Sequence, residues 1–209
     1  MEKPKIAVFT RMHYKNDIPE SNLFCFENYY LPALKNQSYQ DFDIIIISND
    51  NEINNNRIRA ILNKSGINKQ VIFTSVKHRI RFQHEIEINI DSDDGVDKDH
   101  IKRIVDIYYN YNYKIDNILV VVKKYIKLNV VTNERYICPE PTKANNGFPT
   151  NFYAVIQRGE KTIGCGERSH NKMDEVIKDI VVIDNIWSTI CIHENNHGTT
   201  LHFTDKKIQ

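Results

Sequence analysis

Residues 86–95 read Ile-Glu-Ile-Asn-Ile-Asp-Ser-Asp-Asp-Gly, a short alternating run that ends in three carboxylates and a glycine. The isoleucines occupy every second position, which is the period of a half-buried β-strand. Asp91, Asp93 and Asp94 therefore fall where the strand ends and the chain turns. Carboxylates this close repel one another, so they must be solvated, paired or neutralised by a hard divalent cation.

The segments around this strand predict an open α/β sheet. Strands are expected at residues 6–10, 43–48, 71–75, 86–90 and 118–122, and helices at 22–36, 55–64 and 99–109. Alternating strands and helices favour a sheet with a ligand site at the carboxyl ends of its strands. Pro32 is expected to kink or split the first helix. No GxGxxG follows the first strand and no GxxxxGK[ST] occurs, so a dinucleotide fold or a P-loop is disfavoured.

The second half of the chain is less regular. A hairpin is expected over residues 152–158 and 161–165, a short helix over 173–180 and a strand over 187–193. The sequence contains no repeat, linker or low-complexity tract. We therefore expect one domain, with a more regular first part at about 1–100 and a second part with a C-terminal strand at about 101–209.

Composition narrows the class of protein. The formal net charge of +1 gives no sign of nucleic-acid binding. The longest apolar runs, residues 44–47 and 118–122, are too short for a transmembrane segment. Four scattered cysteines without a CxxC pair are typical of reduced packing residues, which favours a cytoplasmic location.

The aspartate cluster has two other interpretations. DSDDG suits a solvated turn, with Asp97 or Asp99 capping the next helix. A calcium loop fails in both registers. With Asp91 first, the glycine falls one place early and Lys102 stands where a Glu should close the loop; with Asn89 first, the glycine and the Glu are both replaced.

Residues 193–197 read HENNH and match the zinc-metallopeptidase motif HExxH. That motif requires a helix, because its two histidines must share one face. The preceding residues alternate like a strand, two asparagines are poor helix formers, and Gly198 follows at once. A zinc metallopeptidase is therefore an alternative that its context disfavours.

Three further features carry a family resemblance. Residues 31–46, LPALKNQSYQDFDIII, resemble the "SL-x-x-QTY-x-x-fEiiv" segment of GT-A glycosyltransferases, in which the next strand ends in an Asp near the nucleoside; Asp50 occupies that place. DSDDG resembles their DxD motif. The tail, residues 187–196, resembles the "W…H…N" ending of the rhamnosyltransferase family, as does the first-strand exit Thr10-Arg11. A glycosyltransferase domain of a large algal-virus protein is a narrower resemblance.

The resemblance implies a GT-A-like, Rossmann-like fold with a mixed, mainly parallel sheet flanked by helices. It also implies a metal-dependent transfer of a sugar, rhamnose in the closest resemblance, from a UDP- or dTDP-linked donor to a glycan or glycoconjugate acceptor. Mn²⁺ or Mg²⁺ suits this chemistry, since these ions bind one or two carboxylates plus substrate phosphates. The predicted metal ligands are Asp91, Asp93, Asp94 and His193, and the predicted nucleotide-sugar contacts are Thr10, Arg11, Asp50, Arg79, Arg81 and Asp91.

The catalytic residues are harder to predict. Asp93 is assigned by the DxD resemblance, and Glu167 and Asp174, with Glu175 beside it, lie where acceptor-side residues are expected. An inverting enzyme needs such a carboxylate as a base, whereas a retaining enzyme does not. Arg79, Arg81 and each of these carboxylates are equally consistent with ordinary surface charges. A non-catalytic nucleotide-binding module is the remaining alternative.

Overall fold

The computed structural model describes the chain except for residues 1, 13, 15, 49–50, 76–83, 112–115, 138–151, 159–164, 166–169, 194–205 and 209. The strands are β1 (Ile6–Met12), β2 (Asp43–Ser48), β3 (Val71–Thr74), β4 (Ile86–Asn89), β5 (Gly95–Val96), β6 (Asn117–Asn129), β7 (Glu134–Ile137), β8 (Tyr153–Gln157), β9 (Asp179–Ile192) and β10 (Lys206–Ile208). The helices are α1 (Glu20–Cys25), the π-helix η1 (Phe26–Tyr30), α2 (Leu31–Lys35), α3 (Glu52–Ser65), α4 (His100–Asn110) and the 3₁₀-helix η4 (His170–Glu175).

The described strands form one mixed sheet in the order β10-β7-β6-β8-β4-β1-β2-β3. Strands β4, β1, β2 and β3 are parallel, as the sequence predicts for the first half. Strands β8, β7 and β10 add antiparallel pairs, and β9 runs parallel to β6 while pairing with β5. The predicted α/β class is confirmed, and the second half makes the sheet mixed.

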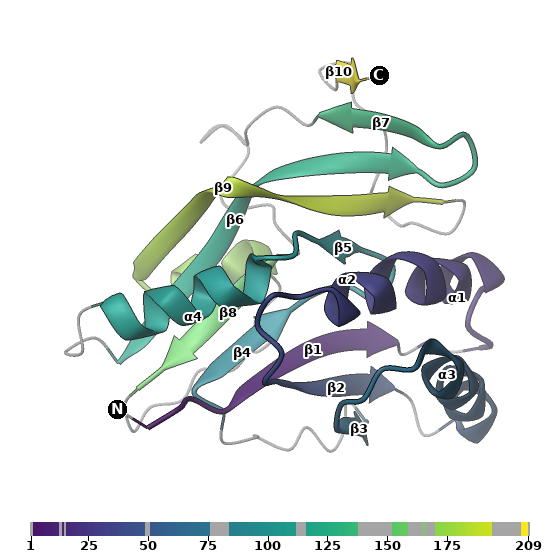
Figure 1. The fold of residues 1–209 in the computed structure, drawn as a ribbon, viewed down its shortest axis with the longest axis horizontal. Coiled ribbons are helices and arrows are strands. Elements are labelled where there is room, and N and C mark those ends of the chain that lie inside the picture. The colour runs from purple at the N-terminus through teal and green to yellow at the C-terminus, as the bar shows by residue number, and fades with distance from the viewer. Residues whose placement is uncertain are drawn as a thin grey trace.

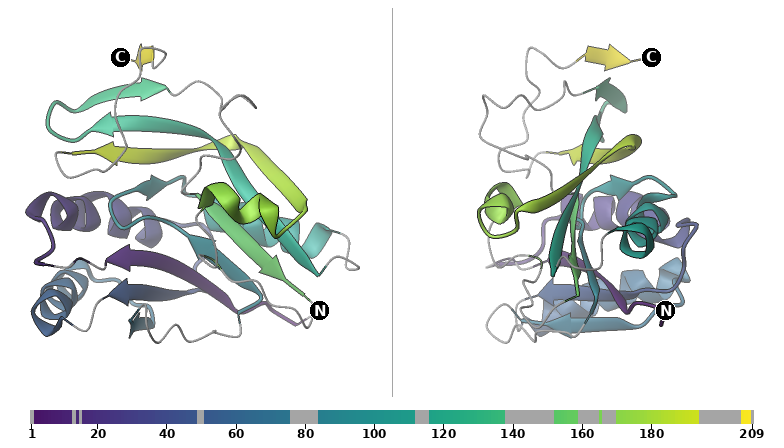
Figure 2. Two further views of the ribbon diagram at one scale, coloured as in Figure 1. Left: turned by 180° about the vertical axis from the view of Figure 1, so that it is seen from behind. Right: turned by 90° about the vertical axis from the view of Figure 1, so that its left-hand side faces the viewer.

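The helices cover the two faces of the sheet unequally (Figures 1 and 2). Helices α1 to α4 pack on one face, where they contribute to the main hydrophobic cluster. The short η4 lies on the opposite face, and its Met173 packs against residues of β6 and β8. Strand β2 is buried on both faces, because Ile44 and Ile46 join the main cluster and Ile45 and Ile47 join another. This explains its unbroken apolar run.

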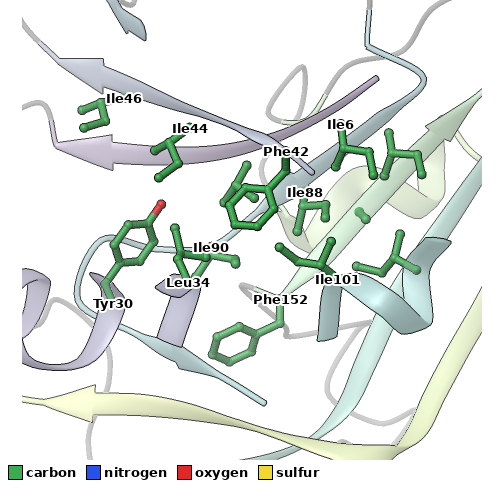
Figure 3. Packing of buried hydrophobic residues seen from close by; sticks show 14 of the residues in the cluster. Ile6, Tyr30, Leu34, Phe42, Ile44, Ile46, Ile88, Ile90, Ile101 and Phe152 are labelled. Carbon is green, nitrogen blue, oxygen red and sulfur yellow. The ribbon is translucent and has the colours of Figure 1, made fainter. Parts of the chain in front are cut away.

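Figure 3 shows the packing that seats β4. Ile88 and Ile90 point from the strand toward Leu34 of α2, Phe42 and Ile101 of α4. The two isoleucines are 0% and 1% exposed, so the alternation read from the sequence corresponds to a face buried against helices. The end of β4, which the aspartates follow, is therefore packed against the hydrophobic core.

The first helical stretch is interrupted, as Pro32 predicts. Between α1 and α2 the chain forms the π-helix η1, and the amide of Leu31 donates to the carbonyl of Phe26, five residues earlier. Proline has no N–H to donate into the helix, so the hydrogen-bond pattern shifts ahead of it. The stretch begins at Glu20 and ends at Lys35, close to the predicted limits.

Helix α3 is longer than predicted because its ends are capped. The side chain of Asn51 accepts a hydrogen bond from the amide of Asn54 at 3.2 Å, and Gly66 ends the helix with φ of 67°. These are the N-cap and the left-handed C-terminal residue that most often delimit helices. None of the described helices is long and apolar enough to cross a membrane.

Three predictions for the second half differ from the structure. Strand β6 runs to Asn129 rather than ending at 122, and β9 begins at Asp179 rather than at 187. The helix predicted for residues 173–180 is wrong, since η4 ends at Glu175 and the chain then enters β9. The cause is tertiary, because β6 and β9 pair along their length from Ile118 with Asp179 to Asn129 with Ile192. The second hairpin strand lies largely outside the described residues.

Candidate functional site

The candidate site lies where β1, β4 and β9 end at one edge of the sheet (Figure 1). Asp91 and Asp93 follow β4, and His193 follows β9. In the parallel pair β1–β4, Phe9 stands opposite Asn89, and the amide of Ile90 donates to the carbonyl of Phe9 at 3.1 Å. Continued by two residues, this register brings Arg11 beside Asp91 on one face of the sheet.

Asp93 and His193 meet although 100 residues separate them. The Oδ2 atom of Asp93 lies 2.9 Å from Nε2 of His193. The Asp93 side chain is 15% exposed and that of His193 is 1% exposed, so the imidazole is buried more deeply than the carboxylate. The contact joins two of the predicted metal ligands.

Strand β5 and Asp94 hold the loop between β4 and β5, residues 90–94 (the aspartate loop), against β9. Gly95 pairs with Thr189 in the β5–β9 ladder. Asp94 is 2% exposed, and its Oδ1 accepts a hydrogen bond from the amide of Cys191 at 3.0 Å. Asp94 was predicted as a metal ligand, and in the structure its carboxyl links the loop to the strand that carries His193.

The pKa of Asp91 reflects the charged groups that surround its carboxyl. Burial and then the neighbouring Asp93 carboxylate raise the pKa of Asp91 to about 6, while Arg11 and a hydrogen bond from Asn89 oppose the rise. Arg11 itself is exposed. The structure therefore brings Arg11, Asp91 and Asp93 together, with more negative than positive charge. A divalent cation would favour the ionised form of both carboxyls.

Tyr14 was not among the predicted site residues. Burial raises the pKa of its hydroxyl to about 12, with further contributions from Asp93 and Asp91, and the hydroxyl is hydrogen-bonded to Ser92. Tyr14 thus lies over the aspartate loop. Its only signal in the sequence is its place in the loop after the first strand, where ligand-contacting residues of α/β sheets gather.

Gln37 is a second residue whose role was not predicted, although it belongs to the quoted QSY segment. Its side-chain amide donates to the carbonyls of Ala33 and Asp97 at 3.0 and 2.7 Å, and its Oε1 accepts from the amide of Ile101 at 3.0 Å. The amide of Ser38 donates to the carbonyl of Lys98 at 2.7 Å. The end of α2 therefore fixes the far side of the aspartate loop.

The other predicted residues either are not part of this group or lie outside the described residues. Thr10 is 1% exposed and lies beside Tyr30, on the helix-covered face. Asp174 is half-buried in η4, and within the described residues its side chain makes no contact with the carboxylates. Asp50, Arg79, Arg81 and Glu167 lie outside the described residues, as do Glu194 and His197 of the HENNH motif. His193 directly follows a strand, a setting that does not suit HExxH.

The donor atoms at the site suit a divalent cation. Adjacent ligands of an octahedral ion bound at about 2.1 Å lie about 3 Å apart. The carboxylate oxygen of Asp93 and the imidazole nitrogen of His193 are separated by 2.9 Å. Among the described residues no group of three His, Cys, Asp or Glu side chains is arranged to hold a metal ion. In the structure the Asp93 and His193 atoms are hydrogen-bonded to each other, and Mg²⁺ commonly takes one or two carboxylates, which Asp93 and Asp91 could supply, plus substrate phosphates.

A family comparison identifies the class of protein. The family described as "Putative rhamnosyl transferase" matches residues 1–204. The chain belongs to this family. The rhamnosyl transferase family is the one that the sequence resembles, and membership places the chain among the glycosyltransferases. A sequence search of curated proteins finds no match.

Solved structures share the fold of this rhamnosyl transferase family member. The crystal structure of S. aureus TarS is 12% identical with a TM-score of 0.53, and the match covers 89% of this chain and 37% of that one. The mannosyltransferase PcManGT from Pyrobaculum calidifontis, in complex with GDP-Man and Mn²⁺, is 10% identical with a TM-score of 0.56 and coverages of 93% and 59%. The chain thus spans less than two thirds of either protein. The predicted GT-A-like fold is confirmed.

Proposed function

We propose that this chain transfers a sugar from a nucleotide-diphosphate donor to a glycan or glycoconjugate acceptor with the help of Mn²⁺ or Mg²⁺. The observation that carries the proposal is the approach of Asp93 to His193 at 2.9 Å, beside Asp91 and Arg11, at the carboxyl edge of the sheet. Ligands of open α/β sheets bind at that edge. The similar mannosyltransferase was solved with GDP-Man and Mn²⁺, a donor and ion of the same kinds.

Each residue of the group has a distinct role in this proposal. Asp93 and His193 would hold the ion, and Asp91 would lie nearer the ribose or sugar. Asp94 would keep the loop in place through its bond to Cys191. When bound, the ion would neutralise negative charge on the departing diphosphate. Arg11 would add a second positive charge on the donor side, because guanidinium groups bind phosphate oxygens well.

On the acceptor side, a hydroxyl oxygen forms a bond to the anomeric carbon as the bond from that carbon to the diphosphate breaks. The hydroxyl proton must pass to a base if configuration is inverted. Asp174 is our candidate for the base among the described residues, because it is half-buried in η4 on the face of the sheet that Asp91 shares. Glu167 remains a second candidate.

Family membership favours rhamnose as the sugar. We propose UDP or dTDP as the nucleotide. We further propose that residues of about 1–100 bind the donor and those of about 101–209 bind the acceptor within one domain. Strands β1 to β4 and the aspartate loop supply the first part, and η4 and β9 supply the second.

A thermal-shift screen tests the donor and metal together, since a ligand that binds the folded state raises its melting temperature. UDP-, GDP- and dTDP-sugars are tested at millimolar concentration with and without Mn²⁺. We expect at least one donor to give a metal-dependent rise that Asp93→Asn abolishes. The matched control is Asp106→Asn, an exposed carboxylate of α4 paired with Lys102, which should behave as wild type.

Two outcomes would count against the proposal. One is the absence of a metal-dependent shift with every donor. The other is an equal shift in wild type and Asp93→Asn, which would place the ion elsewhere. Hydrolysis of the responding donor, measured as released nucleotide, separates an enzyme from a binding module, because only a catalyst loses turnover in the variant.

A further inference from the structure

Glu87 is a buried carboxyl that the site described above does not use. It lies in the middle of β4, between strands β1 and β8, and is 5% exposed. Strand alternation places Glu87, Asn89 and Asp91 on one face of the sheet. Carboxyl side chains are rarely buried unless they are hydrogen-bonded or paired with a charge, so we expect Glu87 to have a hydrogen-bond partner.

Among the described residues, Glu87 bonds to Cys165, which lies 78 residues later in the chain. The amide of Cys165 donates to Oε2 of Glu87 at 2.6 Å, and its thiol donates to the backbone carbonyl of Glu87 at 3.0 Å. Cys165 is 2% exposed. Both bonds are therefore buried, where an unpaired amide would be costly.

The same face holds η4. Cys165, Met173 and Ile177 pack in one cluster with Tyr153 and Val155 of β8, the residues that stand opposite Asn89 and Glu87 in the β4–β8 ladder. Met173 is 0% exposed and Ile177 is 2% exposed. Asp174 is the neighbour of Met173, so the packing that seats η4 also sets the place of Asp174.

We propose that Glu87 is a positioning residue that fixes Cys165, and through the shared cluster the acceptor-side helix η4, against the strand that precedes the aspartate loop. The inference rests on the proposed function. From Glu87 to Asp91 the strand advances about 13 Å, at about 3.3 Å per residue. The donor-side carboxylates Asp91 and Asp93 thus follow the end of β4, and Cys165 is bonded to its middle.

The chemistry of Glu87 suits this role better than an apolar residue would. A valine or leucine at this place would satisfy the strand pattern and the surrounding cluster, but it would leave the Cys165 amide without an acceptor. Glutamine keeps an oxygen at the same reach. Aspartate keeps the carboxyl but withdraws it by about one bond length, so the hydrogen bond to Cys165 should weaken.

The test compares Glu87→Leu, Glu87→Asp and Glu87→Gln in the whole chain, with the donor and ion that stabilise the wild type. We expect Glu87→Leu to lower kcat for transfer by about tenfold to a hundredfold, as small displacements of reacting groups do. The thermal shift given by donor and Mn²⁺ should stay unchanged, because the aspartate loop is held elsewhere. The kcat of Glu87→Asp should lie between those of the wild type and Glu87→Leu, and the kcat of Glu87→Gln should be close to that of the wild type.

A second measurement does not depend on activity. The rate at which each cysteine is alkylated, measured by peptide mass spectrometry, reports whether the Cys165 thiol has become accessible. Cys165 should react faster in Glu87→Leu than in wild type, whereas Cys25 and Cys191, both 0% exposed, should stay protected. Ile58→Ala in α3, a core change on the other face of the sheet, controls for a general loss of stability.

The outcomes separate the inference from the proposed function. Wild-type kcat together with unchanged protection of Cys165 in Glu87→Leu and Glu87→Asp would overturn the inference. So would an equal loss of kcat in Ile58→Ala at matched stability. If the wild type itself shows neither a metal-dependent shift nor turnover, the proposed function fails, and Cys165 labelling then decides whether Glu87 holds the segment.

Discussion

His100 should make the protein less stable as the pH falls from 7 to 4. This residue begins α4, is 0% exposed, and neither of its ring nitrogens has a hydrogen-bond partner among the described residues. Burial lowers the pKa of His100 from 6.5 to about 4. The unfolded chain therefore takes up a proton below about pH 6.5, whereas the folded chain does so only near pH 4.

The size of the effect follows from the two pKa values. Each pKa unit corresponds to about 1.4 kcal/mol, so the free energy of unfolding should fall by about 2 kcal/mol at pH 5 and by about 3 kcal/mol at pH 4. At pH 7 the contribution of His100 to the pH dependence is close to zero. Below about pH 3 both states are protonated, and this residue causes no further loss.

Urea unfolding of wild type and His100→Leu at pH 7 and pH 5 measures the effect. Leucine has nearly the volume of histidine and no polar atoms, so the variant should be at least as stable at pH 7. The wild type should lose about 2 kcal/mol more than the variant between the two pH values. The other seven histidines and the carboxyls cancel in this comparison. Equal losses in the two proteins would refute the reasoning.

Three further substitutions test the supports of the site by urea unfolding. Gln37→Leu should lower the free energy of unfolding by about 1–3 kcal/mol, because the amide of Ile101 loses its acceptor and the carbonyl of Ala33 loses a donor, whereas the carbonyl of Asp97 still accepts from the amide of His100; wild-type stability would show these bonds to be unimportant. Asn51→Ala should cost about 1 kcal/mol by removing the cap of α3, and Asn51→Asp should restore it; equal stability of both would contradict the cap. Asp94→Ala should cost about 1–3 kcal/mol and Asp94→Asn much less, since asparagine still accepts from Cys191; the reverse order would argue against this bond.

The first half of the fold could be predicted because its signals are local. The apolar run of β2 fixed that strand at residues 43–48 without error, and Pro32 predicted the break that appears as η1. The caps at Asn51 and Gly66 could also have placed the ends of α3, because their chemistry is local too. The limits of the strands in the second half depend on the pairing of β6 with β9, which joins residues about 60 apart and so is not visible in a short stretch of sequence.

The candidate site likewise has a part that the sequence predicted and a part that only the tertiary structure showed. The pattern of residues 86–95 predicted a strand that ends in carboxylates, and family resemblance pointed to His193. Neither could show that Asp94 turns toward Cys191, that Tyr14 lies by Ser92, or that Glu87 meets Cys165. Such contacts join positions tens of residues apart, and a polar residue in a strand looks the same whether it faces water or a buried partner.

The sequence by itself therefore determined the class of fold, the strand that carries the aspartates and the family of the protein. Periodicity, proline and capping act over a few residues, so these features can be read directly from the chain. Only the tertiary structure decided which carboxyls gather at the edge of the sheet and which support it. That choice depends on the register of β4 against β1 and β8 and on the meeting of β5 with β9. A shift of one residue in either would turn these side chains to the opposite face.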